Sequence, residues 1–117
     1  MLASKHAQIA LDWLVVSDEE FSEGRLMQAS EKLWGVAAHA ILAVAIERGW
    51  RHGGHRDFVV TVGRLAEESG NETLNEDFDA ARKFHANFYQ NFMEDSVLEI
   101  FRPKVHQFVP SILAFLD

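Results

Sequence analysis

The stretch Leu33–Ile46, which reads LWGVAAHAILAVAI, decides the fold of this chain. All of its residues are apolar except Gly35 and His39. Because a helix that is apolar on nearly every side is buried on every side, we predict a central helix here, surrounded by others. It is expected to span about Arg25–Arg48, and Gly49 fits the left-handed position that ends a helix.

Further helical segments are predicted around this central helix, because apolar residues recur along them at steps of three and four. No segment shows the period of two that is typical of a half-buried strand. Short connections between long amphipathic helices favour antiparallel neighbours. We therefore predict an all-α protein, an up-and-down four- to five-helix bundle whose third helix is short. The other segments are about 4–23, about 58–69, one that opens at the capping pattern Thr73–Glu76 and one that opens at Ser96–Glu99.

Three residues give expectations about where these helices begin and break. Asp57 follows a Gly-Gly pair and is expected to cap the third helix. Pro103 and Pro110 each remove a backbone donor from the last helix. We expect either a break near Arg102 or a kinked helix there.

The composition limits the classes of protein. A chain of 117 residues fits one domain, so a single helical domain is expected over residues 1–117. The absence of cysteine excludes a disulfide framework, a zinc–thiolate site and a cysteine nucleophile. With 11 basic and 18 acidic residues, the net charge of −7 argues against the basic face of a duplex DNA-binding protein.

Targeting and membrane-spanning signals are not recognisable in the sequence. The first ten residues lack an apolar core after a basic start. The apolar run Val36–Ile46 is too short to cross a bilayer. We therefore expect a cytoplasmic protein that does not associate with membranes.

Two histidines are candidates for a site in the interior. His39 lies on a polar stripe of the central helix with Gln28, Lys32 and Gly35, and His85 lies within an apolar stripe. If their helices pack antiparallel, both imidazoles face one cavity, where they are able to move protons near neutral pH. The alternative is a pair of core histidines, each bonded to a carbonyl or to a neighbour such as Glu31. No helical metal-ligand pattern is present, so no metal is expected.

The loop between the second and third helices is the one concentrated basic element. Its glycines expose backbone N–H groups, its guanidinium groups match phosphate and its indole is suited to stacking on a base. This mixture favours a nucleotide or a single strand as ligand. The alternative is a solvated turn whose arginines pair with nearby acids. The candidate residues are Arg48, Trp50, Arg51, His52, His55 and Arg56.

Two other features point to partners. Helical spacing places Arg82, His85 and Tyr89 on roughly one face, which is either a further binding face or the edge of an aromatic core. The first helix carries two apolar stripes, one with Leu14 and one with Trp13, so it is expected to be buried on two sides. A second copy of the chain is the natural cover for the outer side, and we expect a homodimer.

The sequence resembles a known family at several of these residues. The elements are Ala29–His39 with its Glu-Lys-x-Trp pattern, Arg48-Gly-Trp50 before a histidine-bearing loop, Leu65, and Phe84–Tyr89. Together they are similar to the PaREP-like branch of the HEPN superfamily, which comprises small all-helical prokaryotic domains. The resemblance implies a HEPN-like bundle, often dimeric, and a partner or toxin role. Many superfamily members are toxin ribonucleases or partners of minimal nucleotidyltransferases.

Catalytic HEPN members carry an arginine, four to six residues, and then a histidine in a late helix. In this chain two residues separate Arg82 from His85, and three separate Arg102 from His106. Six residues separate Arg48 from His55, but these lie in a glycine loop. The sequence therefore departs from the catalytic pattern.

Three functions follow as hypotheses, none with a cofactor. The first is a non-catalytic module that binds a nucleotide or nucleic-acid end, or docks a nucleotidyltransferase. The second is a metal-independent toxin ribonuclease with His85 or His55 as base and Arg82 or Arg48 as cation. The third is a non-enzymatic oligomerising scaffold. The predicted ligand-binding set is Glu31, Lys32, His39, Arg48, Trp50, Arg51, His52, His55, Arg56, His85 and Tyr89.

Overall fold

The computed structural model describes residues 2–90 and 95–116, without the side chains of 87–90, 95 and 96. Every regular element in that part of the chain is a helix, so the predicted all-α bundle is confirmed. The elements are α1 (Leu2–Ser22), α2 (Leu26–Arg48), α3 (His55–Ser69), α4 (Thr73–Gln90) and α5 (Asp95–Leu113).

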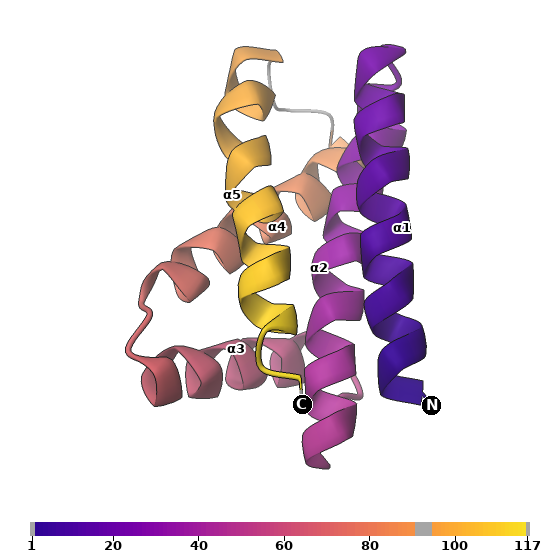
Figure 1. Cartoon of the computed structure of the whole chain (residues 1–117). Coiled ribbons are helices and arrows are strands. Elements are labelled where there is room, and N and C mark those ends of the chain that lie inside the picture. The colour runs from indigo at the N-terminus through magenta and orange to yellow at the C-terminus, as the bar shows by residue number, and fades with distance from the viewer. Residues whose placement is uncertain (1, 91–94, 117) are drawn as a thin grey trace.

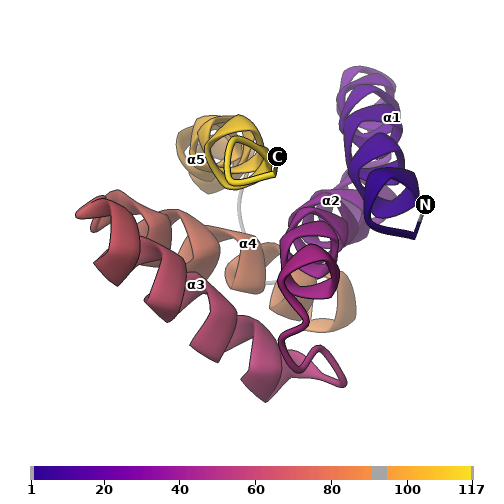
Figure 2. The same cartoon turned by 60° about the horizontal axis from the view of Figure 1, so that its bottom comes forward.

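Helix α2 is the centre of the bundle, as the sequence predicts. It packs against each of the other four helices, and every residue from Ala29 to Ile46 is buried or half-buried. Figure 1 shows α1 and α2 running antiparallel and side by side, with α5 upright on the other side of the bundle. Helix α4 crosses behind them, and the short α3 lies across the lower end (Figures 1 and 2).

The turn after α2 brings the basic loop over α3. Gly49 has a φ of 72°, and its N–H donates to Ile46 at 3.1 Å. The N–H of Trp50 donates to Ala45 at 2.8 Å, which folds Trp50 back on the last turn as predicted. This capping geometry fixes the position of Trp50 and the direction in which the loop leaves α2.

Helix α3 begins earlier than predicted. It starts at His55 rather than Phe58, and its N-cap is the extended Gly54. Asp57 is therefore not the cap, since it lies inside the first turn. Its carboxylate instead accepts the N–H of Gly53 at 2.8 Å, which ties the glycine loop to the helix.

Helix α5 continues through both prolines, so the predicted break near Arg102 is wrong. Pro103 and Pro110 lie inside one helix that runs from Asp95 to Leu113. Each proline removes one backbone hydrogen bond. The buried side chains of this helix, among them Phe108 and Ile112 at 0% exposure, supply the packing that offsets that loss.

Helix α2 is long and apolar enough, by length and composition alone, to cross a bilayer. The helix has 23 residues. The expectation that no segment crosses a bilayer was based on the shorter apolar run Val36–Ile46. Just over half of its most apolar window, 56%, is buried inside the bundle, as in the core helix of a folded domain.

The close approach of α1 to α2 depends on Gly35. A Cβ atom placed on Gly35 would lie 2.6 Å from Cζ3 of Trp13, well inside van der Waals contact. The indole of Trp13 thus packs directly on bare backbone, and Lys32 Nζ lies 4.2 Å from the centre of the ring. This contact sets the spacing of the two helices.

Gly35→Ala is therefore expected to lower the free energy of unfolding by about 1–3 kcal/mol, because the new methyl group forces Trp13 and α1 to move. Denaturant titration measures the change. The control is Gly63→Ala in α3, where nothing lies within 4 Å of the added Cβ. That substitution is expected to stabilise the helix by about 0.5–1 kcal/mol. Equal effects of the two substitutions would contradict the packing described for Gly35.

Candidate functional site

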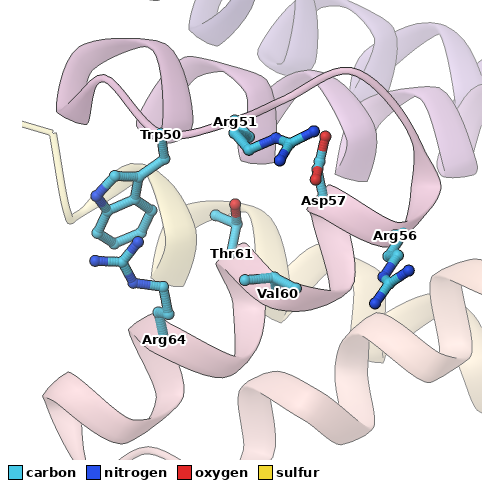
Figure 3. A pocket seen from close by; sticks show the side chains of 7 residues that line it. All are labelled: Trp50, Arg51, Arg56, Asp57, Val60, Thr61 and Arg64. Atoms are coloured by element: carbon cyan, nitrogen blue, oxygen red, sulfur yellow. The ribbon is translucent and has the colours of Figure 1, made fainter.

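A cavity of about 440 Å³ lies between the loop after α2 and the outer face of α3, and Figure 3 shows its side chains. We call it the arginine pocket. Trp50 and Arg64 lie at one end, Arg51 in the middle above Thr61, and Arg56 at the other end. Three of the seven lining residues are arginines. The lining consists of Trp50, Arg51, Arg56, Asp57, Val60, Thr61 and Arg64.

The indole of Trp50 holds a guanidinium group in place at one end of the pocket. Arg64 Cζ lies 3.8 Å from the centre of the ring, and Arg48 Cζ lies 5.1 Å from it. Such cation–π contacts orient a guanidinium without consuming its N–H donors in a carboxylate pair. Trp50 therefore positions Arg64, and the base-stacking role predicted for its ring competes with that contact.

Arg48, by contrast, is committed to an ion pair. Its Nη1 atom lies 2.5 Å from Oε2 of Glu68. This hydrogen bond lowers the pKa of the Glu68 carboxyl, with a smaller contribution from the charge of Arg64. The alternative of arginines paired with nearby acids is thus correct for Arg48.

The arginines of the pocket differ from the rest of the chain. Four of the seven arginines pair with carboxylates in the described residues. Arg51, Arg56 and Arg64 form no ion pair within that same part of the chain, although the protein carries a net charge of −7. Unpaired cations that surround one cavity in an acidic protein are the arrangement expected of an anion site.

Four of the seven lining residues are absent from the predicted ligand-binding set: Asp57, Val60, Thr61 and Arg64, of which Thr61 and Arg64 bear most on ligand binding. Arg64 lies two helical turns after Arg56, and Thr61 lies one turn after Asp57, so both share the face of α3 that the loop covers. Arg64 follows Arg56 after two steps of four residues, and this spacing was the signal in the sequence that could have indicated Arg64. Nothing in the sequence marks Thr61, because its role depends on burial.

A second group of predicted residues gathers around Trp34 of α2; we call it the imidazole cluster. The rings of His55 and His85 both stack on the indole, with centroid distances of 5.2 and 4.9 Å. His85 Nδ1 lies 3.0 Å from Oε1 of Glu31, so the carboxylate orients this imidazole. The other carboxylate oxygen of Glu31 is buried without a hydrogen bond. The predicted contact between His85 and Glu31 is confirmed.

His55 links the imidazole cluster to the arginine pocket, because the next residue is Arg56. Burial lowers the pKa of His55, and the positive charges of Arg82 and His85 lower it further. His55 is consequently held in its neutral form near pH 7, the form that accepts a proton. The structure thus brings together His55, His85 and Arg82, three of the four residues proposed for a ribonuclease, whereas Arg48 lies apart in its ion pair with Glu68.

His39 belongs to a different cluster, and the cavity predicted between it and His85 is wrong. Its Nδ1 atom lies 2.8 Å from Nδ1 of His6, and its ring meets the edge of Trp13 at a centroid distance of 4.8 Å. Both partners belong to α1, whereas the partners of His85 described above belong to α2. The two imidazoles of the prediction share no contact in the described structure.

The remaining predicted residues have separate places. Lys32 lies over Trp13, beside His39 rather than in the arginine pocket. In the exposed loop, a ring nitrogen of His52 lies 2.9 Å from the carbonyl oxygen of Trp50. The side chain of Tyr89 lies outside the described residues. Among those described, no three His, Asp or Glu side chains are close enough together to hold a metal ion.

This geometry defines the class of the protein as an all-helical domain with a cationic pocket at one end. The sequence model of the archaeal PaREP1/PaREP8 family matches residues 5–109 of the chain. The protein therefore belongs to the archaeal PaREP1/PaREP8 family. Neither curated proteins nor solved structures gave a match.

The pair His6–His39 gives a prediction on pH. Burial lowers the pKa of His39, and the neighbouring His6 lowers it further. The unfolded chain therefore binds more protons than the folded chain below about pH 6.5, the usual value for histidine. Stability is complete above that pH and is lost as the pH falls toward the lower pKa of the folded state. In His39→Gln, the unfolding midpoint is expected to fall less between pH 7 and pH 5 than in the wild type. Parallel pH profiles would contradict this.

Proposed function

We propose that this protein binds a nucleotide or a nucleic-acid end in the arginine pocket. The observation that carries the proposal is the set of three arginines, unpaired within the described residues, around one cavity of an acidic protein. Guanidinium groups bind phosphate oxygens through strong, directional hydrogen bonds. The volume of about 440 Å³ lies within the usual range for small-ligand sites.

The net charge of the whole chain favours a short ligand over a long one. At −7, the protein repels an extended polyanion everywhere except near its basic elements. A compact anion that contacts only the arginine pocket avoids most of that repulsion. The pocket therefore supports binding of a nucleotide or a strand end better than binding along a duplex.

The same surface is compatible with the wider role that the HEPN resemblance implies. A nucleotidyltransferase partner that carries its nucleotide to this face would contact Arg51 of the loop and Arg56 in the first turn of α3. We keep docking of such a partner as part of the proposal. The exposed apolar residues Leu11 and Val15 of α1, at 46% and 59% exposure, support the homodimer, although they lie outside the two stripes that the sequence indicated.

The test is calorimetric titration of Arg51→Gln/Arg56→Gln with ribonucleotides and a short single-stranded RNA. The wild type is expected to bind at least one of them, and the double variant about tenfold or more weakly, because two charge-assisted hydrogen bonds are lost. The control is Lys5→Gln/Lys83→Gln, which removes the same charge from α1 and α4 and is expected to bind like the wild type. A wild type that binds none of these ligands, or an unchanged isotherm for the arginine variant, rejects the site.

A metal-independent ribonuclease is the second candidate, favoured by the imidazole cluster. A neutral His55 is suited to take the proton of a ribose 2′-hydroxyl, whose oxygen then attacks the adjacent phosphorus. The bond to the 5′-oxygen breaks, and His85 is suited to protonate that oxygen. Arg82 would stabilise the charge of the transition state. The products would be a 2′,3′-cyclic phosphate and a 5′-hydroxyl.

Cleavage of mixed single-stranded RNA in the presence of a chelator tests this second candidate. If the cluster is catalytic, the wild type cleaves, and His55→Gln and His85→Gln each reduce the rate by about a hundredfold or more. His52→Gln, an exposed loop histidine outside the cluster, is the control and keeps the wild-type rate. RNA that stays intact with the wild type disposes of the ribonuclease without affecting the binding proposal.

A further inference from the structure

The hydroxyl of Thr61, which lines the cavity, is the feature of the arginine pocket that the general proposal does not use. Thr61 is only 2% exposed, and Figure 3 shows its side chain directed from α3 toward the space below Arg51. Its hydroxyl has no hydrogen-bond partner among the described residues. Because this hydroxyl opens onto the pocket and the described residues leave its hydrogen bonds unused, it is available to a ligand atom opposite it.

The charge of the pocket specifies how strongly anionic that ligand is. The lining carries three guanidinium groups and the carboxylate of Asp57, so that 3 − 1 gives a net charge of +2. A terminal phosphate group carries a charge of about −1.5 to −2 at pH 7. A phosphodiester carries a single negative charge and matches the pocket less well.

The number of donors leads to the same ligand. Arg51 and Arg64 lie on either side of Thr61 in Figure 3, and the contact with Trp50 positions Arg64. Two guanidinium groups and one hydroxyl are three separate donors. A phosphomonoester has three terminal oxygens, one for each, whereas a diester has only two.

The remaining space accommodates the organic part of such a ligand. The cavity of about 440 Å³ exceeds the size of a phosphate group alone. Val60 and the indole of Trp50 give it an apolar wall, and Arg56 lies at the end away from Trp50. The pocket therefore suits a phosphate that is attached to a larger, partly apolar group.

We infer that the arginine pocket selects a terminal phosphate, a phosphomonoester, over an internal phosphodiester, and that the Thr61 hydroxyl determines this choice. The inference rests on the proposed function and narrows it. The terminal phosphate belongs either to a free nucleoside monophosphate or to the phosphorylated end of a single strand. Both present the same chemistry to Arg51, Arg64 and Thr61.

The experiment compares matched ligands by calorimetry. Each ribonucleoside 5′-monophosphate is titrated into the wild type, followed by the methyl ester of the tightest binder, which has one fewer charged oxygen. The monophosphate is expected to bind about tenfold or more tightly than its ester, the usual value of one hydrogen bond to a charged group. A tetranucleotide with and without a 5′-phosphate forms the second arm. The arm in which the terminal phosphate increases the affinity more shows whether the natural ligand is a free monophosphate or a phosphorylated strand end.

Substitutions at Thr61 then test the role of the hydroxyl. Thr61→Val keeps the shape and is expected to remove most of the preference for the monophosphate, whereas Thr61→Ser is expected to retain it. Thermal unfolding of both variants checks that the fold is intact. Equal wild-type affinities for monophosphate and ester, or a preference that survives in a folded Thr61→Val, would overturn the inference while binding itself stands. Absence of binding to every nucleotide and strand would reject the proposed function as well.

Discussion

The enclosure of α2 by the other four helices is the constraint from which the rest of the structure follows. Its small residues let four other helices approach it, and Gly35 admits the indole of Trp13 directly onto backbone. The same burial fixes the direction in which each polar side chain of α2 points. Glu31 and Trp34 face the imidazole cluster, while His39 faces α1. The sites are thus consequences of how one apolar helix is enclosed.

The end of α2 is equally important for the arginine pocket. The left-handed Gly49 stops the helix and turns Trp50 back, so that the loop passes over α3 instead of away from it. The charges of the loop then meet those of α3 in one cavity. Within the described residues four of the seven arginines pair with carboxylates, whereas the three in this pocket form no ion pair. Local backbone geometry and charge distribution together define the arginine pocket.

Much of the fold was predictable from the sequence, because its signals are local. The apolar run of α2 and the glycines that end helices act over a few residues, and the structure confirms them. The start of α3 was predicted wrongly, and the sequence left open whether α5 breaks near Arg102 or continues. In both cases contacts elsewhere in the chain decide: Asp57 binds the loop from inside the helix, and core packing offsets the prolines.

The site was only partly predictable, since it depends on directions around helices. Trp34 and His39 are five residues apart, which at 3.6 residues per turn separates them by roughly 140° around α2. His85 stacks on Trp34, so it lies on a different side of α2 from His39, and the two imidazoles share no cavity for that reason. Thr61 carries no signal at all, because a threonine in a helix is ordinary until its side chain is found to line a cavity. The basic loop, in contrast, was visible from composition alone.

The central claim is that Arg51 and Arg64 bind an anion from within the pocket. The most direct measurement is a nuclear magnetic resonance titration of the isotope-labelled protein with a nucleoside monophosphate, observing the Nε–H signals of the arginines. The account predicts saturable shifts of the Arg51 and Arg64 signals, with those of the paired Arg25 unchanged. Signals of Arg51 and Arg64 that stay in place, or shifts spread equally over all the arginines, would contradict it.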